Sequence, residues 1–158
     1  MDAEVARWVE ALRLAPHPEG GFFRETYRSS ATVGDRNTST AIYFLITAGN
    51  FSALHRIASD ELWHFHAGQA LEIVTIDPQG TRRDLRLGLD LERRERPQHH
   101  VLAGAWFGAR LASAGSSYAL VSCTVAPGFD FADFQLADRA RLTKRYPQHA
   151  SLIGELTR

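Results

Sequence analysis

The chain has 158 residues, of which 44% are hydrophobic, and its 18 Lys and Arg residues balance its 18 Asp and Glu residues. This length and composition predict one folded domain with a substantial core and exclude a disordered chain. Because the net charge is zero, the chain lacks the excess of positive charge that is typical of a nucleic-acid-binding protein. No apolar stretch approaches the roughly 20 residues that a membrane helix needs. The single cysteine and the acidic N-terminus favour a cytoplasmic protein without nucleic-acid or membrane partners.

Residues 1–15 predict an N-terminal helix. Apolar residues recur there at three- and four-residue steps, at Val5, Trp8, Val9 and Leu12. Asp2 is suited to cap the first turn of this helix. Pro16 and Pro18 end this pattern, and Gly20-Gly21 predicts a turn before the next element.

Residues 22–125 alternate between apolar and polar side chains in short runs separated by turn residues. These runs predict strands at 22–28, 41–47, 51–57, 61–66, 70–77, 82–87, 101–112 and 118–125. No helix of crossover length interrupts them, so we expect an antiparallel sandwich or barrel. Residues 136–158 predict a helical tail, with helices at 138–145 and 150–156. The expected fold is therefore all-β, a single domain over residues 1–158 with short helices at both ends.

The segment 55–68 has the composition of a functional site, because it contains three of the seven histidines, two acids and a tryptophan. Strand alternation places Glu61, Trp63 and Phe65 on one face, with His64 and His66 on the other. If His55 shares the inner face, the barrel encloses an imidazole, a carboxylate and aromatic walls. This combination is typical of a small-molecule site.

The spacing of His55, Ile57, Glu61 and Gly68 resembles the first motif of the cupin superfamily, in which a second histidine occupies the place of Ile57. Five ordered strings over almost the whole chain resemble one branch of that superfamily, the cupin-5 family, formerly a domain of unknown function. They are HPEGGFFRETYR at 17–28, TAIYFL at 40–45, DELWHFHAG at 60–68, AGAWF at 103–107 and VAPGF at 125–129.

The resemblance implies a cupin jelly-roll barrel (a double-stranded β-helix), often a homodimer, related in shape to the 3,5-epimerases of nucleotide-linked deoxysugars. It implies a metal-independent epimerase or isomerase that moves a proton on a small polar molecule, a sugar or a nucleotide sugar. His55 occupies the place of the catalytic base in those epimerases. Glu61 would orient the imidazole or act as a second acid or base. The catalytic tyrosine of those enzymes has no counterpart at 123–127, and Tyr27, Tyr43 and Tyr118 are the candidate substitutes.

The predicted pocket walls are Trp63, Phe65 and Phe107, with Tyr43 beside them and Arg24 as a candidate for binding a substrate anion. The alternative reading of Arg24 is a salt bridge on its strand.

Metal-binding cupins supply three histidines and a glutamate, whereas Ile57 and Phe107 stand at two of those places here. Only His55 and Glu61 remain, and three protein ligands are the usual minimum. His66 would complete a divalent-metal site only if its strand were shifted in phase. We therefore expect no cofactor. A non-catalytic binding or sensing cupin and a metal-dependent oxygenase or isomerase stay as alternatives. His17 is assigned to a loop without a role, and Cys123 to the core.

Overall fold

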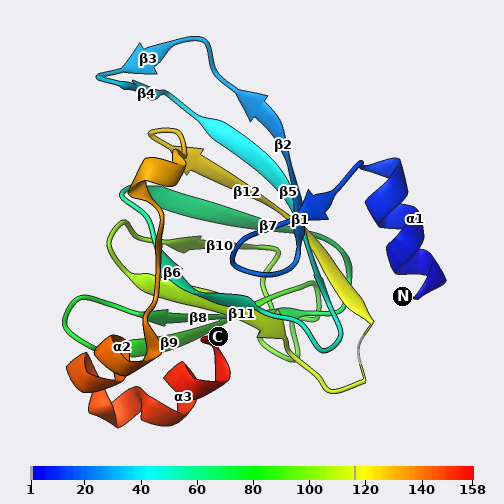
Figure 1. Ribbon diagram of the computed structural model, residues 1–158. Coiled ribbons are helices and arrows are strands. Elements are labelled where there is room, and N and C mark those ends of the chain that lie inside the picture. The colour runs from blue at the N-terminus through cyan, green and yellow to red at the C-terminus, as the bar shows by residue number, and fades with distance from the viewer. Residues whose placement is uncertain (1, 116) are drawn as a thin grey trace.

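The computed structural model describes residues 2–115 and 117–158, and its named strands form antiparallel pairs in two facing sheets (Figure 1). The larger sheet has the strand order β1 (Ala15–Pro16), β2 (Phe22–Arg28), β5 (Thr40–Thr47), β12 (Tyr118–Ala126), β7 (Asp60–Gly68) and β10 (Gln98–Val101). The smaller sheet has the order β13 (Gln135–Leu136), β6 (Ser52–Arg56), β11 (Trp106–Leu111), β8 (Leu71–Ile76) and β9 (Arg82–Leu87). A hairpin of β3 (Thr32–Val33) and β4 (Arg36–Asn37) extends beyond the sheets. The all-β jelly-roll prediction is confirmed.

Three helices flank the sheets: α1 (Ala3–Ala11), α2 (Arg139–Arg145) and α3 (Ala150–Glu155). Asp2 caps α1 as predicted, because its carboxylate accepts a hydrogen bond of 2.8 Å from the Glu4 amide. Two 3₁₀ turns, η1 (Phe131–Asp133) and η2 (Pro147–His149), complete the helical segments. Within residues 2–115 and 117–158, no helix has the length and apolar character needed to cross a bilayer.

The main hydrophobic core lies between the two sheets, where strand alternation directs apolar side chains inward. Trp63 and Phe44 from the larger sheet and Phe107 from the smaller sheet are each at most 1% exposed. A second cluster buries Leu152 and Ile153 of α3 against the outer face of the smaller sheet. The tail therefore covers this sheet and supports β6 from outside (Figure 1).

The structure differs from the predicted elements in several places, and the short strands β1, β3 and β4 were not predicted. The run predicted at 101–112 forms one strand, β11, at 106–111. Residues 98–101 form a separate strand, β10, and the turn between the two contains Gly104, with a φ of +81°. The tail is also not purely helical, because β13 pairs with β6 at the edge of the smaller sheet. Strand β13 follows directly after an aromatic loop at 129–134, whose phenylalanine side chains border a cavity between the sheets.

Candidate functional site

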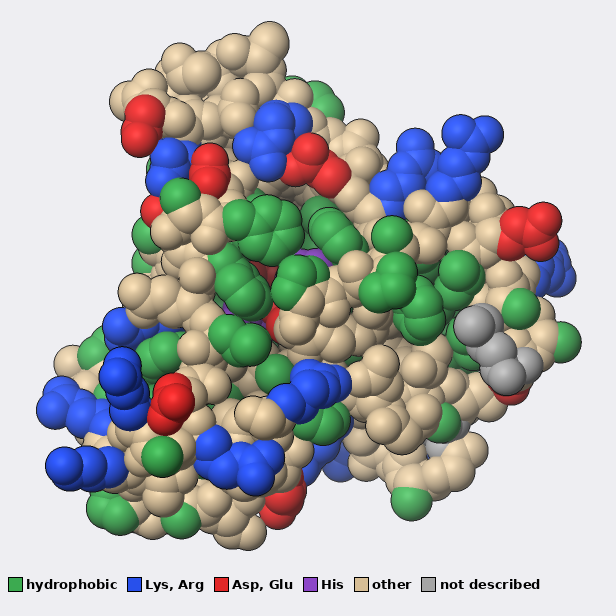
Figure 2. All heavy atoms as spheres, in the orientation of Figure 1, with side chains coloured by type: hydrophobic (Ala, Val, Ile, Leu, Met, Phe, Trp, Pro, Cys, Tyr) green, Lys and Arg blue, Asp and Glu red, His purple; other side chains and the backbone are tan. Residues whose placement is uncertain are grey.

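A cavity opens between the two sheets, and Figure 2 shows it as a hollow bordered by hydrophobic side chains with histidine and acidic atoms inside. Its volume is about 80 Å³. Its polar lining comes from both sheets and from the loop before β2. The residues that carry its chemistry are His17, Glu19, His55, Glu61 and Cys123.

The loop between β1 and β2 inserts Glu19 into the barrel. Gly20 and Gly21 have φ values of +107° and +79°, and a Cβ atom on Gly20 would lie only 2.1 Å from the Phe51 carbonyl oxygen. Only glycine fits this conformation and this close approach. The Glu19 carbonyl accepts hydrogen bonds from the Ala53 amide and from the Arg158 guanidinium, at 2.8 and 2.7 Å. The turn therefore fixes the direction of the Glu19 side chain.

His55 and Glu19 form a buried ion pair, with 2.8 Å between His55 Nε2 and Glu19 Oε2. On the other side of the ring, His55 Nδ1 lies 2.7 Å from the Ala53 carbonyl oxygen, and Ser52 donates to Glu19 Oε1. Burial favours the neutral form of each group, but the attraction between them prevails. It raises the pKa of His55 and lowers the pKa of Glu19. Both imidazole nitrogens face acceptors, so the ring is a proton donor.

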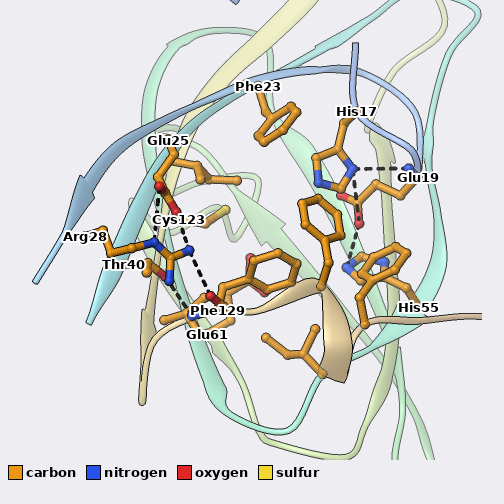
Figure 3. A pocket seen from close by; sticks show the side chains of 15 residues that line it. His17, Glu19, Phe23, Glu25, Arg28, Thr40, His55, Glu61, Cys123 and Phe129 are labelled. Carbon is orange, nitrogen blue, oxygen red and sulfur yellow. Dashed lines mark hydrogen bonds and ion pairs between the residues drawn. The ribbon is translucent and has the colours of Figure 1, made fainter. Parts of the chain in front are cut away.

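His17 lies beside this pair as a neutral imidazole. Its Nδ1 atom accepts a hydrogen bond of 3.1 Å from the Glu19 amide, so the ring proton is on Nε2. Burial lowers the pKa of His17, although Glu19 acts in the opposite direction. Figure 3 shows the second ring nitrogen pointing toward the cavity. His17 thus presents an N–H group to any molecule bound there.

Glu61 projects from β7 across the cavity from the imidazoles (Figure 3). Burial raises the pKa of Glu61 to about 7, with a further contribution from Glu19, while the charge on His55 acts against the rise. The Cys123 thiol lines the same cavity, and burial raises the pKa of this thiol well above its ordinary value. Near neutral pH, Glu61 therefore exists as both carboxylate and carboxylic acid.

The mouth of the cavity combines an ion pair with aromatic rings. Arg28 binds Glu25 at 2.6 Å and also donates to the Phe129 carbonyl oxygen. The rings of Phe129 and Phe131 pack edge to face, with their centroids 4.9 Å apart. Phe131 is 52% exposed, so an apolar surface borders the entrance.

The structure brings His55 and Glu61 to one cavity, but the three predicted walls lie behind its lining. Trp63 and Phe107 are core residues, and Phe107 packs on the His55 ring with a centroid distance of 4.1 Å. Phe65 packs against the same core. Residues nearer the mouth line the cavity. Trp63, Phe65 and Phe107 therefore pack behind the lining residues and do not form the cavity wall.

The predicted positions of Arg24 and Tyr43 in the pocket are wrong, because both lie on the outer face of the larger sheet. His66 lies on the same outer face, as strand alternation predicted, so the phase shift that would bring it to a metal does not occur. Arg24 donates to the Leu12 carbonyl oxygen, and the rings of Tyr43 and His66 have centroids 6.4 Å apart. His66 Nε2 lies 2.8 Å from the Ser122 hydroxyl. Strand alternation explains these positions, since the neighbours of Arg24 and Tyr43 on the inner face, such as Phe23, line the cavity.

The side chains of the cavity do not fit a cupin metal centre. Ile57 lies in the lining at one ligand position, and the two nitrogens of His55 are occupied by Ala53 and Glu19. Within residues 2–115 and 117–158, no group of three or more His, Cys, Asp or Glu side chains is arranged to hold a metal ion. That the protein works without a metal stays a prediction.

Sequence reasoning missed His17 and Glu19 as site residues. It assigned the partner of His55 to Glu61, whereas the direct contact is made by Glu19. A signal was present in the string at 17–21, where two titratable residues flank a proline and precede two glycines. A turn of this kind aims the preceding side chains toward the sheet that follows.

Comparison with known proteins agrees with this architecture. The chain superposes over its full length on protein SO0799 from Shewanella oneidensis, with a TM-score of 0.93, 41% identity and 98% of that chain covered. A hypothetical protein from Leishmania major gives a TM-score of 0.90 and 39% identity, with 99% of each chain covered. An uncharacterized protein of Saccharomyces cerevisiae, YML079W, is 29% identical over 150 residues, which cover 83% of this chain and 74% of the yeast protein.

More distant structures share the fold alone. Oxalate decarboxylase from Bacillus subtilis superposes with a TM-score of 0.59 at 12% identity, over 89% of this chain and 36% of the enzyme. The model of the Cupin_5 family, described as cupin superfamily (DUF985), matches residues 6–137. With its barrel, its motifs and this match in agreement, the chain belongs to the Cupin_5 family of the cupin superfamily.

Proposed function

We propose that the protein is a metal-independent epimerase or isomerase that transfers a proton at the carbon next to the carbonyl group of a small sugar. The observation that supports this is the position of two acid/base systems on one cavity, Glu61 and the His55–Glu19 pair. A buried carboxyl group whose pKa is about 7 is suited to accept and return a proton near neutral pH.

In this proposal, Glu61 as a carboxylate removes the proton from carbon, and the bonding electrons move to the carbonyl oxygen to give an enolate. The Nε2–H group of His17 donates a hydrogen bond to that oxygen, where negative charge develops. For isomerisation, the hydroxyl group on the deprotonated carbon passes its proton to the enolate oxygen, and Glu61 returns its own proton to the former carbonyl carbon, so the carbonyl group moves by one position. Return from the His55–Glu19 pair to the opposite face gives epimerisation. The Nε2–H group of His55 faces Glu19, so the proton from this pair passes through the Glu19 carboxylate.

The charges in the cavity favour an uncharged sugar over a nucleotide sugar. Arg28 is the one guanidinium group among the described lining residues, and it is already paired with Glu25. His55 and Glu19 neutralise each other. A diphosphate group would therefore meet no free cation and would face the partial negative charge of Glu61.

The test is solvent exchange at carbon. The protein is incubated in D₂O with small aldoses and ketoses and, separately, with nucleotide sugars, and deuterium uptake is followed by NMR. We expect uptake into an uncharged sugar, abolished by Glu61→Gln and retained by Glu10→Gln, which alters an exposed glutamate on α1. Thermal stabilisation by a sugar without any exchange would contradict the proposal and favour a binding or sensing function.

We propose in addition that two copies of the chain associate, as the resemblance to dimeric barrels implies. The outer face of the larger sheet supports this, because Leu62 is 37% exposed there beside His64 and His66. Sedimentation equilibrium at micromolar concentration tests the homodimer, and a monomeric mass would contradict it.

A further inference from the structure

A second groove lies on the other side of β6 from the cavity, between β11, β13 and α2. Its volume is about 720 Å³. Adjacent residues of β6 face the two spaces, since His55 lines the cavity and Arg56 lines the groove. The strand therefore separates the groove from the acid/base site.

The groove carries an excess of positive charge. Arg56 lines one side, and Arg141 and Arg145 of α2 line the other. In the part of the chain that the structure describes, none of these three guanidinium groups forms an ion pair with a carboxylate. Asp138 also lines the groove, but its carboxylate is engaged at 2.8 Å by the Arg141 amide as the cap of α2.

The three guanidinium groups are placed to act together. Arg56 is held over the ring of Trp106, with 4.5 Å from its guanidinium carbon to the ring centroid, and its Nε donates to Gln135. Its two terminal nitrogens keep their donors for a ligand. Arg141 and Arg145 are four residues apart, so they project from the same face of α2. Planar guanidinium groups match the oxygens of a phosphate group in two-pronged hydrogen bonds.

We propose that this groove binds a phosphorylated small molecule through Arg56, Arg141 and Arg145, separately from the sugar in the cavity. The chemistry recognised is a phosphate ester or pyrophosphate group. The contrast between the two spaces carries the inference, because the guanidinium group in the cavity is paired and those in the groove are not.

The experiment is isothermal titration calorimetry of the intact protein with inorganic pyrophosphate, ADP and adenosine. We expect one saturable site per chain for pyrophosphate and ADP, weakened by salt, and no binding of adenosine. The double variant Arg141→Gln/Arg145→Gln should weaken binding by at least about tenfold. The matched control, Arg7→Gln/Arg93→Gln, removes the same charge from exposed positions on α1 and on the turn before β10.

Three outcomes would overturn the proposal: no saturable binding of either phosphate compound, equal weakening in the control, or equal binding of adenosine. Arg56→Gln provides a second variant on the opposite side of the groove, and a thermal melt checks that each variant is folded. The Glu61→Gln protein should bind pyrophosphate normally. Deuterium exchange into a sugar, in this variant or in the wild type, tests only the chemistry of the cavity. Pyrophosphate binding tests only the groove, so the two proposals can fail separately.

Discussion

The Nε2 atom of His55 lies 2.8 Å from Oε2 of Glu19 and joins a strand of the smaller sheet to the loop that enters the larger one. Both side chains are less than 8% exposed. A buried pair of this kind contributes little relative to an apolar replacement, but removing one partner leaves the other charge without compensation.

Replacing Glu19 by Gln should therefore destabilise the protein by about 3 kcal/mol, the cost of leaving a buried charge unpaired. Denaturant unfolding measures this difference. The control is Glu25→Gln, which breaks the more exposed pair with Arg28 and should cost less than about 1 kcal/mol. Equal losses of stability in the two variants would contradict the larger cost expected for leaving a buried charge unpaired.

The stabilisation from the pair should depend on pH in a defined window. The lowered pKa of Glu19 gives stability above its ordinary value of 4.5, which is lost as the pH falls through the lowered pKa. The raised pKa of His55 gives stability below its ordinary value of 6.5, which is lost as the pH rises through the raised pKa. The difference between wild type and Glu19→Gln should thus be largest between these ordinary values and should shrink on both sides.

Glu61 should make the folded protein less stable as the pH rises. Between pH 4.5 and its raised pKa of about 7, the unfolded chain releases the Glu61 proton while the folded protein keeps it. The free energy of unfolding then falls by about 3 kcal/mol over this interval because the shift spans more than two pKa units. Glu61→Gln should remove this loss, giving a more stable protein at pH 8 and little change at pH 4. Equal stability at pH 8 would contradict the raised pKa.

The turn before β2 should not tolerate a side chain at Gly20. Gly20→Ala should destabilise by more than about 2 kcal/mol, because it combines a positive φ with a clash at the Phe51 carbonyl. Gly49→Ala is the control, since its φ is +74° but no atom lies within 4 Å of the added Cβ. It should cost only about 1 kcal/mol, the strain of the backbone. Thermal unfolding of both variants distinguishes the clash from the strain.

The single thiol of Cys123 reports on access to the cavity, because it is 1% exposed and its pKa is well above the ordinary value. A thiol-reactive dye should therefore label the native protein slowly. Phe131→Ala opens the mouth and should speed labelling severalfold, whereas Leu91→Ala, at an exposed position in another loop, should not. Unchanged labelling in Phe131→Ala would show that this ring does not close the entrance.

The fold could be predicted where side-chain alternation is regular. The strand at 22–28 was predicted with the bounds of β2, and 82–87 with those of β9. The five strands β1, β3, β4, β10 and β13 were missed because each has too few residues to show a period, and Gln98–Val101 is nearly polar throughout. Alternation also assigned Glu61 and Trp63 to the inner face.

The candidate site could be predicted only in part, because its central contact joins segments distant in sequence. Periodicity locates His55 on an inner face but carries no information about the residue that meets it across the barrel. Glu19 reaches it through a turn whose path depends on Gly20 fitting against the Phe51 carbonyl. That fit arises from tertiary packing, about which periodicity carries no information. The misplacement of Arg24 was avoidable, because alternation puts Arg24 on the face opposite Phe23, which lines the cavity.

The contact between Arg158 and the Glu19 carbonyl has a consequence for the order in which the molecule assembles. Arg158 also donates to the Phe51 carbonyl and packs over the Phe51 ring, so one side chain holds both segments around the turn. During synthesis, the strands up to β12 can emerge and pair before residue 158 has been added. Contacts between such distant residues form late because closing long loops is slow. The acid/base centre should therefore mature after the barrel strands have paired.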